Sequence, residues 1–176
     1  MASLKDKIKS SQNKNGFSII EVVAAFTIMT VGMMGVASLS LLNIQANRIN
    51  KNYLIASMLA QEGLELVRNV RDNNWLTLGN NWNDDITGND GNYTIDYNFN
   101  IDDTPDLPTD GGAKMYLNGN GFYDHDSAGA FTPYYRLIAI SEDASGNFFT
   151  ASSTVSWADS QGQYSYIAET SLFDWY

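Results

Sequence analysis

The chain has 176 residues, no cysteine and a formal net charge of −10. A charge this negative argues against nucleic-acid binding, because a phosphate backbone requires a basic surface. Without disulfides, an exported domain must be stabilised by core packing or by a bound cation. The charge is also uneven, since residues 1–16 carry +3, residues 17–71 carry +1 and residues 72–176 carry −14.

The chain begins with a short lysine-bearing leader, residues 1–16, followed by an almost wholly apolar run, residues 17–42. As a helix, the part of this run beyond Glu21 would span about 32 Å, close to the thickness of a bilayer core. Gly32 and Gly35 are its weak points, because each costs about 1 kcal/mol of helix stability relative to Ala. By the positive-inside rule, the leader is expected in the cytoplasm and the acidic remainder outside.

Glu21 is the only charge in the apolar run. A carboxylate in hydrocarbon costs about 2.5–3.5 kcal/mol on insertion scales, so its presence requires a reason. An ordinary secretory signal does not fit, because the run is too long and Gly16 precedes it. A plain signal anchor has no need of Glu21.

Cleavage between Gly16 and Phe17 would explain the carboxylate. Phe17 would gain a free α-amino group four residues before Glu21, at the cytoplasmic edge of the bilayer. In a filament, the amine of one subunit could neutralise Glu21 of a neighbour shifted along the axis. Removing one partner of such a buried pair costs about 3–5 kcal/mol, so the pair would fix the register between subunits.

The helical pattern continues through residues 43–72 but becomes amphipathic. Small and apolar residues recur there at spacings of three and four: Ala46, Ile49, Tyr53, Ala56, Ala60, Gly63, Val67 and Val70. Such a stripe is typical of one buried helix face. A coiled coil is an alternative, but the small residues favour docking onto the chain's own sheet.

Residues 73–176 are expected to form a globular antiparallel β domain. Four strand-like segments occur at residues 93–100, 134–141, 148–158 and 164–170, and the connections between the last three are typical of hairpins. An acidic, loop-like insertion at about 101–133 separates the first two. The expected fold class is α+β, a long N-terminal helix packed on a small antiparallel sheet of about four strands.

Candidates for metal binding and catalysis are few. His125, the only histidine, is better explained as a turn residue than as a zinc ligand. Calcium is an alternative to a simply solvated acidic loop, although the spacing does not match an EF-hand. Its oxygen ligands would be Asn118, Asn120, Asp124 and Asp126, with Asp84, Asp85, Asn89 and Asp90 as a second set. No nucleophile motif or phosphate-binding loop is present, so we expect no enzyme and, calcium aside, no cofactor.

The aromatic residues allow two interpretations. If exposed, they could stack on sugars or on a partner surface, whereas those in strands are expected in the core. The residues concerned are Trp75, Trp82, Tyr134, Tyr135, Trp157 and Trp175.

The string NGFSIIEVV, preceded by Lys14 and followed by the apolar run, resembles the class III leader and N-terminus of type IV pilins and type II secretion pseudopilins. The resemblance covers about Lys14 to Leu42. It implies cleavage by a prepilin peptidase after Gly16, N-methylation of Phe17 and a filament-register role for Glu21. It also implies a lollipop-like subunit, and it strengthens the calcium alternative, because some pseudopilins have calcium-stabilised loops.

The function that the resemblance implies is that of a structural prepilin. Its partners would be other pilin subunits, in a homo- or heteropolymer, the prepilin peptidase, an inner-membrane assembly platform and a cytoplasmic ATPase. It would cross the inner membrane once before assembly and form an extracellular or periplasmic filament afterwards. Two alternatives remain: a minor pilin or a secretion or competence pseudopilin, and a monomeric membrane-anchored extracellular binding domain.

Two features depart from the pattern of many pilins. The chain cannot form their C-terminal disulfide loop, and its apolar run contains no proline. The helix is therefore expected to loosen in a filament near Gly32 and Gly35.

Overall fold

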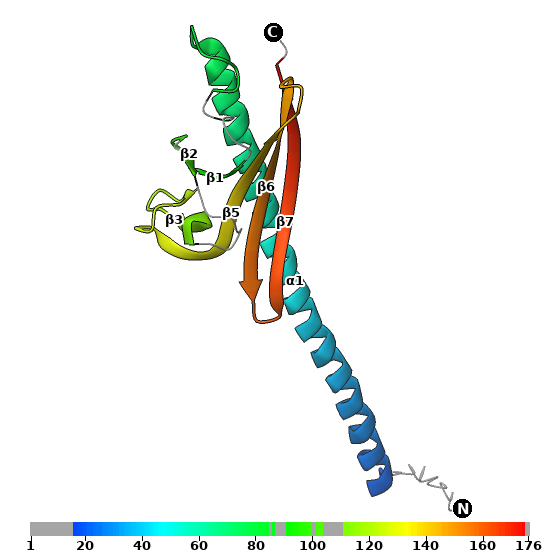
Figure 1. Cartoon of the computed structure of the whole chain (residues 1–176). Coiled ribbons are helices and arrows are strands. Elements are labelled where there is room, and N and C mark those ends of the chain that lie inside the picture. The colour runs from blue at the N-terminus through cyan, green and yellow to red at the C-terminus, as the bar shows by residue number, and fades with distance from the viewer. Residues whose placement is uncertain (1–15, 85, 87–90, 100, 104–110, 175–176) are drawn as a thin grey trace, which may run out of the picture. The chain divides into compact units, whose positions relative to one another are not determined.

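The computed structural model describes residues 16–84, 86, 91–99, 101–103 and 111–174 (Figure 1). These residues form one long helix and one antiparallel sheet, so the predicted α+β class is confirmed. The helix is α1 (Ile19–Leu76). The strands are β1 (Gly91–Ile95), β2 (Ile101–Asp103), β3 (Lys114–Leu117), β4 (Tyr123–Asp124), β5 (Ala130–Glu142), β6 (Phe148–Asp159) and β7 (Gly162–Phe173), with a 3₁₀ turn, η1 (Gly111–Ala113), before β3.

The chain divides into two units, Met1–Asn47 and Arg48–Tyr176, and each is described by itself. In the first unit, every described residue is exposed, including the apolar side chains of α1. Among the most exposed apolar side chains are Phe17, just before the helix, at 82%, and Ile19 at 84% and Ile28 at 75%. Among the described residues of this unit, this part of the helix therefore has nothing against which to pack.

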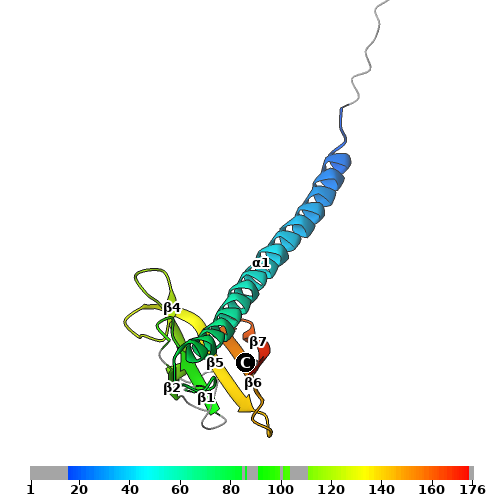
Figure 2. The same ribbon diagram turned by 90° about the horizontal axis from the view of Figure 1, so that it is seen from above.

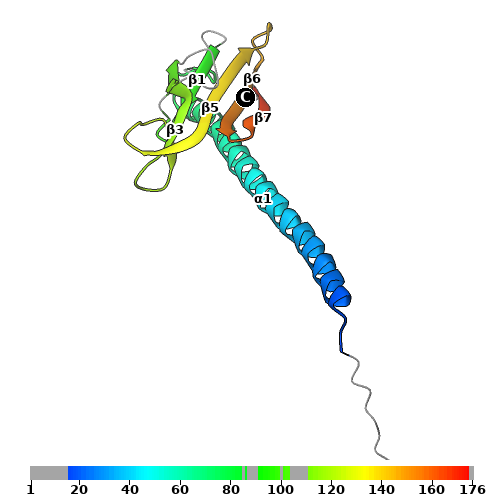
Figure 3. The same cartoon turned by 90° about the horizontal axis from the view of Figure 1, so that it is seen from below.

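In the second unit, the three C-terminal strands form the expected meander. β5 pairs with β6 from Tyr134↔Trp157 to Glu142↔Phe149, and β6 pairs with β7 over the whole length of β7. The other edge of β5 is shared, because β1 pairs with its second half and β3 with its first half. Figure 3 shows β1 and β3 on one side of β5 and β6 on the other.

The second half of α1 lies across one face of this sheet (Figure 2). The predicted stripe is buried at Ala56, Ala60, Gly63 and Val67, whereas Ala46 is exposed. Two apolar clusters form the core. One joins Leu64 and Val67 to Ile138 and Phe149, and the other joins Ala56 and Ala60 to Met115, Val155 and Trp157. Each large side chain buried here contributes about 1.5–3 kcal/mol, so the unit is stabilised by core packing.

Gly63 allows the helix to approach the sheet closely. A Cβ atom at this position would lie 2.8 Å from Ile138 Cδ1, 2.8 Å from Ser153 Oγ and 3.2 Å from Arg136 Cδ. Arg136 itself is fully buried under the helix. Its guanidinium donates to the carbonyl oxygens of Leu59 (3.3 Å) and Ile95 (2.7 Å) and to Glu62 Oε1 (3.2 Å), so one side chain joins helix, β1 and β5.

The prediction of a loop at about 101–133 is wrong for much of that segment, because β2, η1, β3 and β4 fall within it. The sheet accordingly has seven strands among the described residues, not four. The strands inside this segment, β2, β3 and β4, are two to four residues long. β2 pairs with β1, β3 pairs with β5, and β4 pairs with β3. Strand formation of this kind depends on distant partners more than on local pattern. The first predicted strand, 93–100, also ends early, at Ile95.

His125 is partly buried beside this insertion. Its Nδ1 lies 2.9 Å from the Lys114 carbonyl oxygen, which can only accept, so Nδ1 carries the proton. Within the described part of the chain, Nε2 is buried without a hydrogen-bond partner. Burial, together with the positive charge of Arg136, lowers the pKa of His125 to about 4. His125 is thus a structural, neutral histidine in the bend that follows β4.

We predict that Gly63→Ala destabilises the second unit. Overpacking costs about 1–3 kcal/mol, which exceeds the gain of up to about 1 kcal/mol in helix propensity. Urea unfolding of the full chain in detergent micelles measures the difference. Gln61→Ala, at an exposed position of the same helix, is the matched control and should change stability by less than about 0.5 kcal/mol. Equal stability of the two variants would contradict the close approach.

We also predict an acid-sensitive step due to His125. The folded protein binds this proton only near pH 4, whereas the unfolded chain binds it near its ordinary pKa of 6.5. The contribution of neutral His125 to the free energy of unfolding is therefore fully present above pH 6.5. It is lost as the pH falls toward 4, and the loss is at most about 3 kcal/mol. Urea midpoints measured across this range should fall less in His125→Gln than in the wild type. Parallel curves would show that His125 is not buried in its neutral form.

Candidate functional site

The predicted cleavage site lies immediately before the helix. Gly16, Phe17 and Ser18 are exposed and non-helical, and a Cβ atom at Gly16 would meet no atom within 4 Å. Exposed, non-helical backbone is what a peptidase can bind and cut. The preceding leader residues, 1–15, lie outside the described residues.

Ser18 begins the helix. Its carbonyl oxygen accepts hydrogen bonds from the amides of Glu21 (3.0 Å) and Val22 (3.2 Å). Ser18 and Glu21 stand in the S-x-x-E spacing of a capping box, although within the described part of the chain neither side-chain hydrogen bond of that motif is formed. The sequence analysis missed Ser18, although this spacing was available to identify it.

Glu21 lies in the first turn of α1. The helix dipole favours a negative charge there, which offsets part of the cost of the carboxylate. Within the described part of the chain, the side chain of Glu21 has no ion pair and no hydrogen bond. It lies on a shallow groove along the helix surface that is otherwise apolar. The residues that line this groove are Phe17, Glu21, Val22, Ala25, Phe26 and Met29.

Hydroxyl groups in the same apolar run are satisfied locally. Thr27 donates to the carbonyl oxygen of Val23 (2.8 Å), and Ser40 donates to that of Val36 (3.0 Å). Because these hydroxyls bond within the helix, they are compatible with lipid or with a packed helix bundle. Glu21 lacks such a local partner and must obtain one from outside the described chain or remain uncompensated.

Gly32 and Gly35 lie inside α1, which is continuous through both. No side chain would obstruct a Cβ atom at either position. Their glycine character therefore has no packing reason within the subunit. The expected loosening of the helix in a filament stays a prediction.

The four residues considered for calcium lie near one another but serve the local turns. Asn118 Oδ1 accepts from the amides of Asn120 and Phe122, each at 3.0 Å, and Asn118 donates to Asp124 at 3.0 Å. Asp126 accepts from the amide of Ala128 at 2.9 Å. Among the described residues, no group of three or more Asp, Glu or His could hold a metal ion. Asp85, Asn89 and Asp90, from the second set, lie outside the described residues.

The aromatic residues are divided between core and surface. Tyr134 and Trp157, both in predicted strands, are each 3% exposed, as the core interpretation predicted. Trp82, outside the predicted strands, stacks on buried Phe149 with ring centres 5.4 Å apart. Tyr135 is partly exposed. Trp75 packs under the guanidinium of Arg71, and Trp175 lies outside the described residues.

By length and composition, α1 is able to cross a membrane. A family model, the prokaryotic N-terminal methylation motif, matches residues 11–37 of the chain. Neither the curated proteins nor the solved structures contain a match to this chain. The matched segment includes the predicted cleavage site, Glu21 and both helix glycines. Residues 11–37 therefore carry the class III signal of type IV pilins and pseudopilins.

Proposed function

We propose that this chain is a structural prepilin, cut between Gly16 and Phe17 and polymerised into a type IV pilus or a pilus-like filament. The observation that carries the proposal is the carboxylate of Glu21, which has no partner among the described residues and lies on the exposed apolar first part of α1, within the methylation motif. The family signal is that of structural precursors, which agrees with the absence of a catalytic motif from the sequence.

The exposed apolar side chains of the first unit require burial. Before assembly, lipid would cover them, since the run is long enough to span a bilayer. After assembly, the same faces would pack against the helices of neighbouring subunits. Transfer from lipid to a helix bundle gains little from the hydrophobic effect, so packing and polar pairing must supply the specificity.

Glu21 would supply that specificity. Removal of the leader creates an amine on Phe17, and N-methylation keeps this amine basic. An adjacent subunit shifted along the filament axis would place its Glu21 against this cation. Any other stagger would leave a carboxylate uncompensated in an apolar interior, at a cost of several kcal/mol.

The charge distribution supports one orientation in the membrane. The +3 leader would stay in the cytoplasm, where the prepilin peptidase and the assembly ATPase act, and the −14 segment would lie outside. An inner-membrane platform and sister pilins would be the remaining partners. The acidic second unit would coat the filament and keep it soluble.

The first prediction concerns processing. The mature chain should begin at Phe17 and carry one additional methyl group, as measured by intact-mass spectrometry of protein from surface fibres. Gly16→Leu should leave the leader attached, because a bulky side chain replaces the residue that precedes the cut. Gly119→Leu, a bulky substitution at an exposed glycine outside the motif where a Cβ atom would meet nothing within 4 Å, is the processing control. A full-length mature protein would instead favour a membrane-anchored monomer.

The second prediction concerns assembly. Glu21→Ala should insert into the membrane at least as well as the wild type, because it removes the cost of the carboxylate. It should nevertheless form few or no filaments, measured as the amount of this chain in sheared surface fibres relative to the membrane fraction. Glu65→Ala, on the exposed face of the same helix, should assemble normally. Normal assembly of Glu21→Ala would count decisively against a register role.

A further inference from the structure

The two edges of the sheet are built differently. One edge ends in β2 and β4, which are three and two residues long. The other ends in β7, which is twelve residues long and pairs with β6 from Gly162↔Asp159 to Phe173↔Phe148 without a shift in register. Within the described part of the chain, no strand pairs with the other side of β7, its open edge. In an antiparallel ladder, alternate residues direct their N–H and C=O groups to opposite sides, so about half of the backbone groups of β7 point to this open edge.

β7 lacks most of the features that protect a sheet edge. Natural edge strands are kept from pairing by shortness, prolines, bulges or charges, lysines above all. β7 contains no proline, no lysine and one charged residue, Glu169. Its side chains on the outer face of the sheet, the face opposite α1, are all exposed, with Ile167 56% exposed in the middle of the strand. This edge is therefore suited to receive a further strand.

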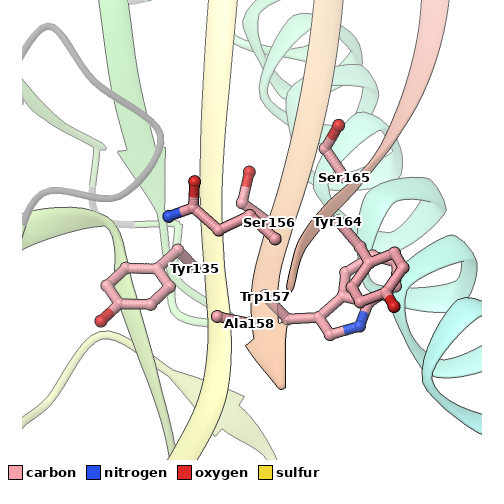
Figure 4. Close-up of a pocket in the computed structure, with 7 residues that line it drawn as sticks. Tyr135, Ser156, Trp157, Ala158, Tyr164 and Ser165 are labelled. Atoms are coloured by element: carbon pink, nitrogen blue, oxygen red, sulfur yellow. The ribbon is translucent and has the colours of Figure 1, made fainter. Parts of the chain in front are cut away.

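A recess in the outer face lies beside the open edge. It has a volume of about 330 Å³ and spans β5, β6 and β7 (Figure 4). The rings of Trp157 and Tyr164 face the other way, toward Tyr53 of α1. Lys114 Nζ lies 3.2 Å from the hydroxyl of Tyr135, which disfavours a second cation in the recess. The outward side chains that line the recess are uncharged, and they are those of Tyr135, Ser156, Ala158, Gln163 and Ser165.

A strand added to β7 would bring its side chains opposite these features. Glu169, Ile167 and Ser165 follow one another on the outer face at intervals of two residues, about 6.5–7 Å. In an antiparallel addition, three alternate residues of the partner would oppose them, with Cβ atoms about 4.5–5.5 Å apart. The partner residue opposite Ser165 would lie next to the recess, so a long side chain at that position could enter it.

Charge determines the kind of partner. The basic residues of 72–176 are Lys114 and Arg136, 5% and 0% exposed, within a segment of net charge −14. A second copy would therefore bring two acidic surfaces together. We propose that the open edge of β7 binds an extended, basic segment of another protein as an eighth strand. This segment would place Lys or Arg opposite Glu169, an aliphatic residue opposite Ile167 and a long uncharged residue opposite Ser165. Main-chain hydrogen bonds would provide affinity, and the recess would provide specificity.

Peptide binding to the full chain in phosphocholine micelles tests this proposal. The probe is a fluorescein-labelled synthetic peptide, TVKTVTQTT, whose Lys, Val and Gln follow the proposed pattern, and empty micelles are the blank. We expect saturable binding by fluorescence anisotropy. Hydrogen exchange measured by NMR should show protection of β7 amides at alternate positions. Of two probes N-methylated at odd or at even residues, one should lose binding, because only one set of amides faces β7.

Variants locate the contact. Glu169→Lys should weaken binding of the probe about three- to tenfold and strengthen binding of TVETVTQTT, in which Glu replaces Lys, by a similar factor. Glu65→Lys makes the same charge change on the exposed face of α1 and should leave the preference between the two peptides unchanged. Ala158→Phe, at an exposed position in the recess, should weaken binding of the probe but not of TVKTVTATT, in which Ala replaces Gln. Urea midpoints confirm that each variant is folded.

Three results would overturn the proposal. The first is no saturable binding of the probe at millimolar concentration, and the second is binding without alternate protection in β7 or without a response to Glu169→Lys. The third is a dimer of the chain, measured by sedimentation equilibrium without peptide, in which the β7 amides are already protected, since a second copy would then fill the edge. None of these results bears on leader cleavage or on the yield of fibres, which test the proposed filament role.

Discussion

The central constraint on this molecule is a carboxylate on an apolar helix segment whose described residues are uncovered within their own unit. Residues 16–48 are exposed throughout, and the side chain of Glu21 has no partner within the described chain. The hydroxyls of Thr27 and Ser40 bond to the helix backbone and need nothing further. A surface of this kind cannot remain in water, so its environment must be lipid or other helices. In either environment, we propose that the charge of Glu21 determines which neighbouring helix can pack against this segment.

The second unit contains no cysteine, so it must be stabilised by non-covalent contacts. It achieves this with a close contact between helix and sheet at Gly63 and with Arg136, which ties the helix to two strands. Burial lowers the pKa of Arg136, and nearby Glu62 opposes that effect, so the cation is retained by pairing. A buried charge of this kind is costly to break, which favours one docking position of the helix over others.

Much of this organisation could be predicted from the sequence, because the signals were local. The apolar run, the small-residue stripe at Ala56, Ala60 and Gly63, and the three C-terminal strands each follow a simple period. The short strands between 101 and 124 could not be predicted in this way, because β2 exists only through pairing with β1, β3 through pairing with β5, and β4 through pairing with β3. The burial of Arg136 and Lys114 was equally hidden, since their partners are distant in sequence. For the candidate site, Gly16, Phe17 and Glu21 could be identified because they belong to one contiguous motif.

The most direct test is the structure of the assembled fibre, determined by cryo-electron microscopy at a resolution that shows side chains. We expect the carboxylate of each Glu21 to lie within hydrogen-bonding distance of the N-terminal amine of Phe17 in an adjacent subunit, enclosed by apolar residues. A fibre in which Glu21 faces solvent or lipid, with no amine nearby, would contradict the role of this charge in setting the register.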